Sequence, residues 1–434
     1  MKITGTVKKV LGNSGWMIGQ QVYFMILSLV IGSLSARYLG PSNYGLINYG
    51  ASLISFFTII SKLGLDGVII NEMIKSPEKQ GDYLGVALVM RLVTSIISLF
   101  AIVIVVRIIE PNNDMLYVIT LLQSFAIILQ SYEVFTYWFQ LNLKMKYVSI
   151  AMMIAQTVAG ILRIGLLVIG ASVYWFALST SIQYIFSAVV VILFFRREKE
   201  KNLKLHCSIR DGKALLCKSY HFIISGLAIT LYMQIDKIMI GKIISNEAVG
   251  IYTAATTIAA LWEFVPTALV NSARPVIIKK YETNHDEYLK RFQQLLLIVS
   301  LMSIFVSVGM MLLGKIAVRI LYGIQYIEAT APLYILIWST GFAMIGTVRS
   351  IWIVAEGYNK YSKYYILIGA AVNMILNIVL ISVWGITGAA IATLISQFVV
   401  ALIAPLFFSK TRAFVKIYFN AYKQIPAIFR KLKV

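Results

Sequence analysis

The sequence predicts an all-α polytopic membrane protein with about twelve transmembrane helices in two six-helix bundles around a central cavity. Hydrophobic residues make up 59% of the 434-residue chain and charged residues only 13%, a composition that a soluble domain of this size would not carry. The apolar residues form runs of roughly twenty, each long enough to cross about 30 Å of hydrocarbon. The twelve runs are residues 16–36, 44–65, 83–106, 115–139, 147–170, 172–195, 219–241, 250–270, 292–314, 329–354, 361–383 and 386–408.

The distribution of basic residues predicts the orientation of these helices. Thirty of the 39 lysines and arginines lie in the two termini and in alternate loops, whereas the loops on the opposite side hold five. Short cytoplasmic loops are the ones enriched in Lys and Arg. Both termini are therefore predicted to be cytoplasmic. The net charge of +21 then lies beside anionic lipid headgroups, and nucleic acid is not an expected partner.

The longest polar stretch between apolar runs divides the chain into four parts. These are an N-terminal six-helix bundle (1–195), a basic cytoplasmic linker (196–218), a C-terminal six-helix bundle (219–408) and a basic amphipathic cytoplasmic tail (409–434) that lies in the inner interface. The segment from Ala36 can be laid over the segment from Gly241 without a gap. This similarity favours a six-helix repeat with a cavity between its halves.

The loops carry no signature of an enzyme or of a metal site. They contain no G-x-x-x-x-G-K-[ST] phosphate loop and no paired-aspartate site, so ATP hydrolysis is not expected. The histidines, His206, His221 and His285, lack metal-ligand spacing and are interpreted as surface residues. We therefore expect no bound metal and no organic cofactor, with H⁺ or Na⁺ as the candidate coupling ion.

Ionisable residues inside the predicted spans are candidate functional residues, because a charge at the middle of a bilayer costs several kcal/mol. Arg163 lies deep in its span and is expected to face an aqueous cavity or an anion, or else to snorkel to the outer surface or bond another helix. Arg91 and Arg349 lie nearer the inner ends of their spans and are expected to snorkel to the headgroups. Glu133, near the inner end of the fourth span, could face either a cavity or the interface.

Two further groups lie in the C-terminal half. Asp236 and Lys237 are adjacent, so they point about 100° apart, and either could form a rim ion pair or take part in transport. Glu263 lies three residues before Pro266 and is a candidate for binding a proton or a sodium ion. Asn373 and Asn377 share a helical face and Gln397 follows in the last span; these amides either link helices or hydrogen-bond a sugar.

Five motifs, taken together and in order, give the chain a recognisable relationship. They are S-A-R-Y-L-G-P-S-N-Y-G, Q-I-D-K-I-M-I-G, N-E-A-V-G-I-Y-T-A-A, N-M-I-L-N-I-V-L-I and W-G-I-T-G-A-A-I-A-T-L-I-S-Q. With these motifs the whole chain closely resembles the Wzx-type polysaccharide flippases, which handle O-antigen or capsule repeat units within the multidrug/oligosaccharidyl-lipid/polysaccharide exporter superfamily.

The resemblance implies a flippase of the bacterial cytoplasmic membrane rather than an enzyme. Such a protein would move an undecaprenyl-pyrophosphate-linked oligosaccharide to the outer leaflet by alternating access, coupled to an ion gradient. Its partners would be that lipid-linked oligosaccharide, anionic lipids, and the polymerase and chain-length machinery of the same pathway.

The candidate residues take roles in this interpretation, and two alternatives stay open. Phosphate is assigned to Arg163, Arg37, Lys237 and Arg274, ion coupling to Asp236 and Glu263, and secondary sugar contacts to Asn373, Asn377 and Gln397. One alternative is a multidrug or metabolite cation antiporter of the same superfamily. The other is a membrane-embedded glycan polymerase, which would be expected to carry a long outer loop that this sequence lacks.

Overall fold

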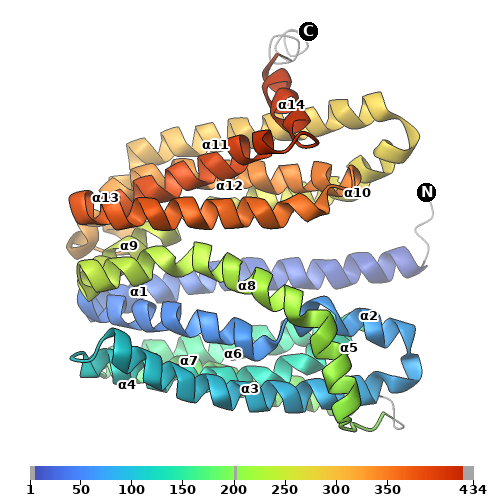
Figure 1. The fold of residues 1–434 in the computed structure, drawn as a ribbon. Helices are drawn as coiled ribbons and strands as arrows, with labels where there is room; N and C mark the ends of the chain where they lie inside the picture. The colour runs from blue at the N-terminus through green and yellow to red at the C-terminus, as the bar shows by residue number, and fades with distance from the viewer. Residues whose placement is uncertain (1–4, 200–202, 424–434) are drawn as a thin grey trace. The chain divides into compact units, whose positions relative to one another are not determined.

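Every regular element that the structure describes is a helix (Figure 1). The structure is a computed structural model that describes residues 5–199 and 203–423, and no β-strand occurs within those ranges. Within these described residues, ten helical stretches are long and apolar enough to cross a membrane. Two of the ten contain a sharp bend and supply two spans each. The predicted all-α polytopic fold of about twelve spans is therefore confirmed, while the cytoplasmic placement of the termini stays a prediction.

The two bends occur at glycines with backbone angles that other residues rarely adopt. Helix α1 (Gly5–Lys62) bends at Gly40, which has φ 72° and ψ 168° and precedes Pro41. Helix α13 (Ser362–Phe398) bends at Gly385, which has φ 57° and ψ −138°. Glycine has no Cβ and tolerates these angles, and proline supplies no amide to continue the first limb. Each predicted loop at these points is thus a bend between two nearly continuous helices.

The chain folds into two compact units, and the first ends at Gln234. Its elements are α1, α2 (Ile69–Lys75), α3 (Gln80–Ile109), α4 (Asp114–Leu129), α5 (Val134–Leu141), α6 (Met145–Val168), α7 (Val173–Glu198) and most of α8 (Ile209–Ile243). Within this unit α1 packs against α3, α4 and α6, and α7 packs against α4 and α6. Large apolar side chains such as Trp138, Phe139 and Phe195 form the core at the end that carries α2 and α5.

The second unit begins at Ile235, inside α8. Its helices are α9 (Asn246–Ala260), α10 (Phe264–Thr283), α11 (His285–Leu321), α12 (Thr330–Ala355), α13 and α14 (Arg412–Tyr422). Helix α12 packs against α9, α10, α11 and α13. Helix α14 lies in the predicted tail and buries Phe414, Tyr418 and Ala421 in the core of this unit, against α11. The rest of that tail, from residue 424, lies outside the described residues.

The first turns of α8 are held to the N-terminal unit by an ion pair. The ammonium of Lys218 lies 2.6 Å from the carboxylate of Glu72 in α2. This hydrogen bond holds the pKa of the Glu72 carboxyl below its ordinary value. By its packing, most of α8 belongs to the N-terminal unit. The cytoplasmic linker at residues 196–218, which separates the two predicted six-helix bundles, stays a prediction about membrane topology.

The bend at Gly40 gives a testable consequence. Replacing Gly40 by Ala is expected to lower the free energy of unfolding by about 1–3 kcal/mol, because the φ and ψ angles of this residue are ones that only glycine adopts readily. Gly32 in the same helix is the control, since a Cβ there would meet nothing within 4 Å and Gly32→Ala should be neutral or slightly stabilising. The measurement is the melting temperature of the purified protein in detergent. Equal melting temperatures for the two variants would contradict this account of the bend.

Candidate functional site

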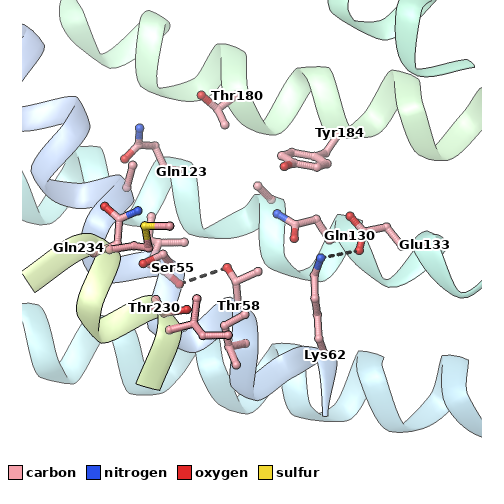
Figure 2. Close-up of a pocket in the computed structure, with 16 residues that line it drawn as sticks. Ser55, Thr58, Lys62, Gln123, Gln130, Glu133, Thr180, Tyr184, Thr230 and Gln234 are labelled. Carbon is pink, nitrogen blue, oxygen red and sulfur yellow. Dashed lines mark hydrogen bonds and ion pairs between the residues drawn. The ribbon is translucent and has the colours of Figure 1, made fainter. Parts of the chain in front are cut away.

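The N-terminal unit contains an open, polar-lined cavity of about 490 Å³. Figure 2 shows that its side chains come from the second limb of α1, from α4 and the turn that follows it, from α7 and from α8. Ten of the lining side chains are polar: Ser55, Thr58, Lys62, Gln123, Gln130, Glu133, Thr180, Tyr184, Thr230 and Gln234. A cavity rich in amides and hydroxyls among apolar helices can hydrogen-bond a polar ligand that hydrocarbon would exclude.

One carboxylate holds two cations at the end of this cavity. Oε2 of Glu133 lies 3.0 Å from Nζ of Lys62 and 3.0 Å from Nη2 of Arg91 (Figure 2 shows the Lys62 pair). Arg91 also donates to the hydroxyl of Tyr137 at 3.4 Å, and that hydroxyl donates to Asp66. Lys62 is the member that remains partly exposed, with 25% of its side chain accessible, and it lines the cavity.

The expected snorkelling of Arg91 and Arg349 is wrong. Their exposed fractions are 1% and 5%, and each finds its partners inside the protein. Arg91 pairs with Glu133, whereas Arg349 donates to the carbonyls of Val400 and Ala401 at 2.5 and 2.9 Å. Those two carbonyls belong to a π-helical turn, Val399–Ile403. The hydrogen-bond pattern of such a turn differs from that of an α-helix, and the spacing of residues in the sequence does not reveal it. Depth along a helix alone therefore did not decide where these side chains point.

The C-terminal unit contains a buried polar cluster centred on Asp236. Oδ1 of Asp236 accepts a hydrogen bond from the amide of Asn377 at 2.6 Å. Oδ2 accepts from the hydroxyls of Tyr252 and Thr393 at 2.7 and 2.6 Å. The Asn377 amide also donates to Oδ1 of Asn373 at 3.0 Å. We call these five residues the Asp236 cluster.

The Asp236 cluster joins four of the five motifs that gave the chain its family resemblance. Asp236 lies in Q-I-D-K, Tyr252 in N-E-A-V-G-I-Y, Asn373 and Asn377 in N-M-I-L-N, and Thr393 in the last motif. The structure thus brings together the predicted ion residue Asp236 with the predicted sugar residues Asn373 and Asn377. The carbonyl oxygen of the Asn377 side chain is buried and has no hydrogen-bond partner among the described residues.

The remaining predicted residues lie apart from these two sites. Arg163 in α6 donates to the hydroxyls of Ser179 and Thr180 in α7 at 2.9 and 3.4 Å, which links two helices. Arg274 in α10 donates to the hydroxyl of Ser350 at 2.8 Å. The others are placed as follows: Arg37 is exposed near the bend in α1, Lys237 follows Asp236 and is half-buried, Glu263 ends the turn between α9 and α10, and Gln397 is half-buried near the end of α13.

Sequence reasoning missed most of the cavity. Lys62 was counted with the basic loop residues because it ends an apolar run, and the single amides Gln123 and Gln130 carried no pattern that separated them from structural residues. Tyr252 and Thr393 were also missed as site residues. The usable signal for these two was their position within the quoted motifs.

Comparison with known proteins identifies the family. The family model described as polysaccharide biosynthesis protein matches residues 10–280, more than half of the chain. This chain belongs to the polysaccharide biosynthesis protein family. A second family model, MatE, matches residues 222–379. The resemblance predicted from the motifs is therefore confirmed, and the chain is a multi-pass membrane protein of the exporter superfamily.

Individual relatives agree in length and fold. The chain is 24% identical to the capsular polysaccharide biosynthesis protein CapF of Staphylococcus aureus, over 89% of the chain and 94% of CapF. It is 24% identical to the probable low-salt glycan biosynthesis flippase Agl15 of Haloferax volcanii, over 83% of the chain and 75% of Agl15. The solved structure of the lipid II flippase MurJ in an inward closed conformation matches with a TM-score of 0.70 at 17% identity, covering 95% of this chain and 92% of MurJ.

Other matches are partial. In two further curated relatives, 26% and 28% identical, the chain spans only 64% and 37% of the relative's length. The similarity to MurJ shows a shared fold. The cargo and the coupling of this chain therefore have to be argued from its own residues.

The shared carboxylate at the cavity gives a testable consequence. Glu133→Gln should lower stability by about 3 kcal/mol or more, because it leaves the buried Arg91 without its counter-ion. The double variant Arg91→Met/Glu133→Gln should recover most of that loss, since the buried charge is then gone. Melting temperatures of the purified proteins test both statements. A Glu133→Gln protein as stable as the wild type would show that the Arg91–Glu133 ion pair does not stabilise the N-terminal unit.

Proposed function

We propose that this protein is a flippase that moves undecaprenyl-pyrophosphate-linked oligosaccharide repeat units across the bacterial cytoplasmic membrane by alternating access, driven by a sodium gradient. The observation that carries the proposal is the polar cavity in the N-terminal unit. A pyrophosphate bearing sugars cannot cross hydrocarbon unaided, so a protein that moves it must offer polar groups at membrane depth. The names of CapF and Agl15 place related proteins in capsule and glycan biosynthesis, which supports the same class of cargo.

The lining of the cavity suits a saccharide. Gln123, Gln130 and Gln234 provide amide donors and acceptors, and Thr58, Thr180 and Thr230 add hydroxyls. Sugar hydroxyls both donate and accept hydrogen bonds, and neutral amides and hydroxyls satisfy both roles. A ring such as that of Tyr184 offers an apolar face for a pyranose. In the proposal these groups contact the sugars nearest the lipid carrier.

Lys62 suits the pyrophosphate. Its ammonium is paired with Glu133, but that carboxylate also pairs with the fully buried Arg91, so two cations share one carboxylate. Arg91 alone can satisfy Glu133 when Lys62 turns toward a phosphate oxygen in the cavity. Charge-assisted hydrogen bonds of this kind are among the strongest that a site can offer. We therefore assign Lys62, which the sequence had not singled out, as the principal phosphate-binding residue, and we keep Arg163 as a residue that positions Thr180 on the cavity wall.

The Asp236 cluster suits a sodium ion. A proton would need only the carboxylate, whereas this cluster adds two amide groups and two hydroxyls around it. Hard cations take oxygen ligands. The side-chain carbonyl oxygen of Asn377 has no hydrogen-bond partner among the described residues, so it is available to coordinate a cation. In the proposal a sodium ion takes oxygens from Asp236, Asn373, Asn377 and Thr393, and displaces hydrogen bonds that now join them.

The functional assignment can be tested in a deletion strain of the source bacterium, with and without the gene supplied on a plasmid. The proposal expects surface glycan to be lost while single, unpolymerised lipid-linked repeat units collect on the cytoplasmic leaflet. Unpolymerised units that reach the outer leaflet would instead identify a polymerase. Unchanged surface glycan would contradict the flippase assignment and favour the multidrug antiporter.

The role of Lys62 predicts a specific export defect. Lys62→Gln should reduce glycan export at least about tenfold, which corresponds to the loss of one charge-assisted hydrogen bond to phosphate. Because Arg91 still neutralises Glu133, the variant should fold and insert normally. Lys75→Gln is the control, since Lys75 is an exposed lysine of the same unit and should leave export unchanged. Normal export by well-expressed Lys62→Gln would remove the proposed phosphate contact.

The role of Asp236 predicts a loss of sodium-dependent stability. Sodium chloride, compared with the N-methylglucamine salt, should raise the melting temperature of the wild type by about 1 °C for each 1 kcal/mol of ion binding. Asp236→Asn should abolish this increase and also block export, whereas Glu247→Gln, which changes an exposed carboxylate in α9, should keep both. A wild-type protein that responds to pH and not to sodium would show that the coupling ion is a proton.

A further inference from the structure

A second cavity of the N-terminal unit, about 600 Å³ in volume, shares no residue with the polar cavity. Its lining comes from α3, α4 and the turn that follows it, α5, α7, Lys199 and Leu205. Its lining is mostly apolar: Leu88, Leu92, Ile128, Leu129, Phe135, Ala188, Ile192, Phe195 and Leu205. We call it the α7 groove, because α7 supplies its longest edge.

The α7 groove changes from apolar to basic along its length. Ala188, Ile192 and Arg196 line it from α7 at spacings of four residues, which keep them on one side of the helix, and Phe195 lies beside them. Lys199 lines it from the position directly after α7 ends. The two cations therefore stand at one end, next to the basic segment that the sequence predicts to be cytoplasmic. A chain molecule lying in the groove would have its apolar part among the helices and its head at the predicted inner surface.

The surroundings of the groove fit an occupant from the bilayer. Val189 and Leu193 of α7 are 49% and 57% exposed, and Leu92 of α3 is 36% exposed, so the helices beside the groove present apolar side chains outward. In a membrane such a surface faces acyl chains. The groove is therefore reached from lipid.

The charges at the basic end fit an anion. Arg196 is exposed, and a guanidinium can bind a phosphate through two parallel hydrogen bonds. The ammonium of Lys199 donates to the carbonyl of Leu203 at 3.3 Å, which holds it at the groove, and a lysine has three donors in all. The carboxylate nearest in sequence, Glu198, is engaged by Lys144 at 2.9 Å.

We propose that the α7 groove is a binding site for one anionic phospholipid of the inner leaflet, with an acyl chain along the groove and the phosphate held by Arg196 and Lys199. Basic pockets between transmembrane helices on the cytoplasmic side are a known way to bind anionic headgroups. This site is separate from the cargo cavity, and it does not depend on the proposed transport activity. The acyl chain of the bound lipid fills this apolar cavity, which would otherwise stay empty beside the bilayer.

The test is native mass spectrometry of the full-length protein in detergent, titrated with phosphatidylglycerol or phosphatidylcholine. The wild type should retain one phosphatidylglycerol in preference to phosphatidylcholine. Arg196→Gln/Lys199→Gln should weaken phosphatidylglycerol binding about 30-fold, at roughly fivefold for each charge near the surface. Ala188→Trp should weaken it as well, because the indole fills the groove while both cations remain.

Arg197→Gln is the matched control, since Arg197 is the exposed neighbour that does not line the groove. Phosphatidylglycerol binding should be unchanged in this variant. An equal loss in Arg197→Gln, or normal binding by Ala188→Trp, would mean that the cations act only as general interface charges and would overturn the proposal. Displacement of phosphatidylglycerol by an equal concentration of undecaprenyl phosphate would also overturn it, because the groove would then belong to the lipid carrier of the cargo.

Discussion

A charged side chain inside hydrocarbon must find its partners within the protein, and this constraint explains the polar organisation of both units. Arg91 is buried because Glu133 and Tyr137 receive it, and Arg349 is buried because a π-helical turn offers two carbonyls. Asp236 is buried because three side chains donate to it. Each of these groups links helices that are distant in sequence, so the same contacts that neutralise charge also fix the helix packing.

The same constraint separates the enclosed charges from those to which we assign cargo and ion binding. Arg91 and Arg349 are almost fully enclosed, and removing either would leave donors or acceptors without partners. Lys62 differs, because it borders a cavity and shares its carboxylate with another cation. The Asp236 cluster differs in another way, since it concentrates oxygen atoms around one carboxylate and leaves one of them unpartnered among the described residues. A cargo or an ion can replace partners at these two places without exposing a charge to hydrocarbon.

Much of the fold, and a smaller part of the sites, could be predicted from the sequence. Apolar runs and basic loops were sufficient for the spans, because hydropathy reports directly on the bilayer. The spacing of Asn373 and Asn377 placed them on one face, but it could not show that Asp236 from α8 meets that face. Arg91 and Arg349 were misjudged because burial of an arginine depends on acceptors from other helices. Lys62 was missed because the end of an apolar run looks like an interface when the cavity beside it is unknown.

The central claim is that the polar cavity of the N-terminal unit receives the saccharide-pyrophosphate part of the cargo. The most direct measurement is photocrosslinking of a radiolabelled lipid-linked oligosaccharide in membranes, with a benzoylphenylalanine placed at Gln130 in the cavity or at Ile161, an exposed residue of α6 that does not line it. The account predicts a labelled adduct at Gln130, weakened by Lys62→Gln, and none at Ile161. Equal labelling at both positions, or labelling at Ile161 alone, would contradict it.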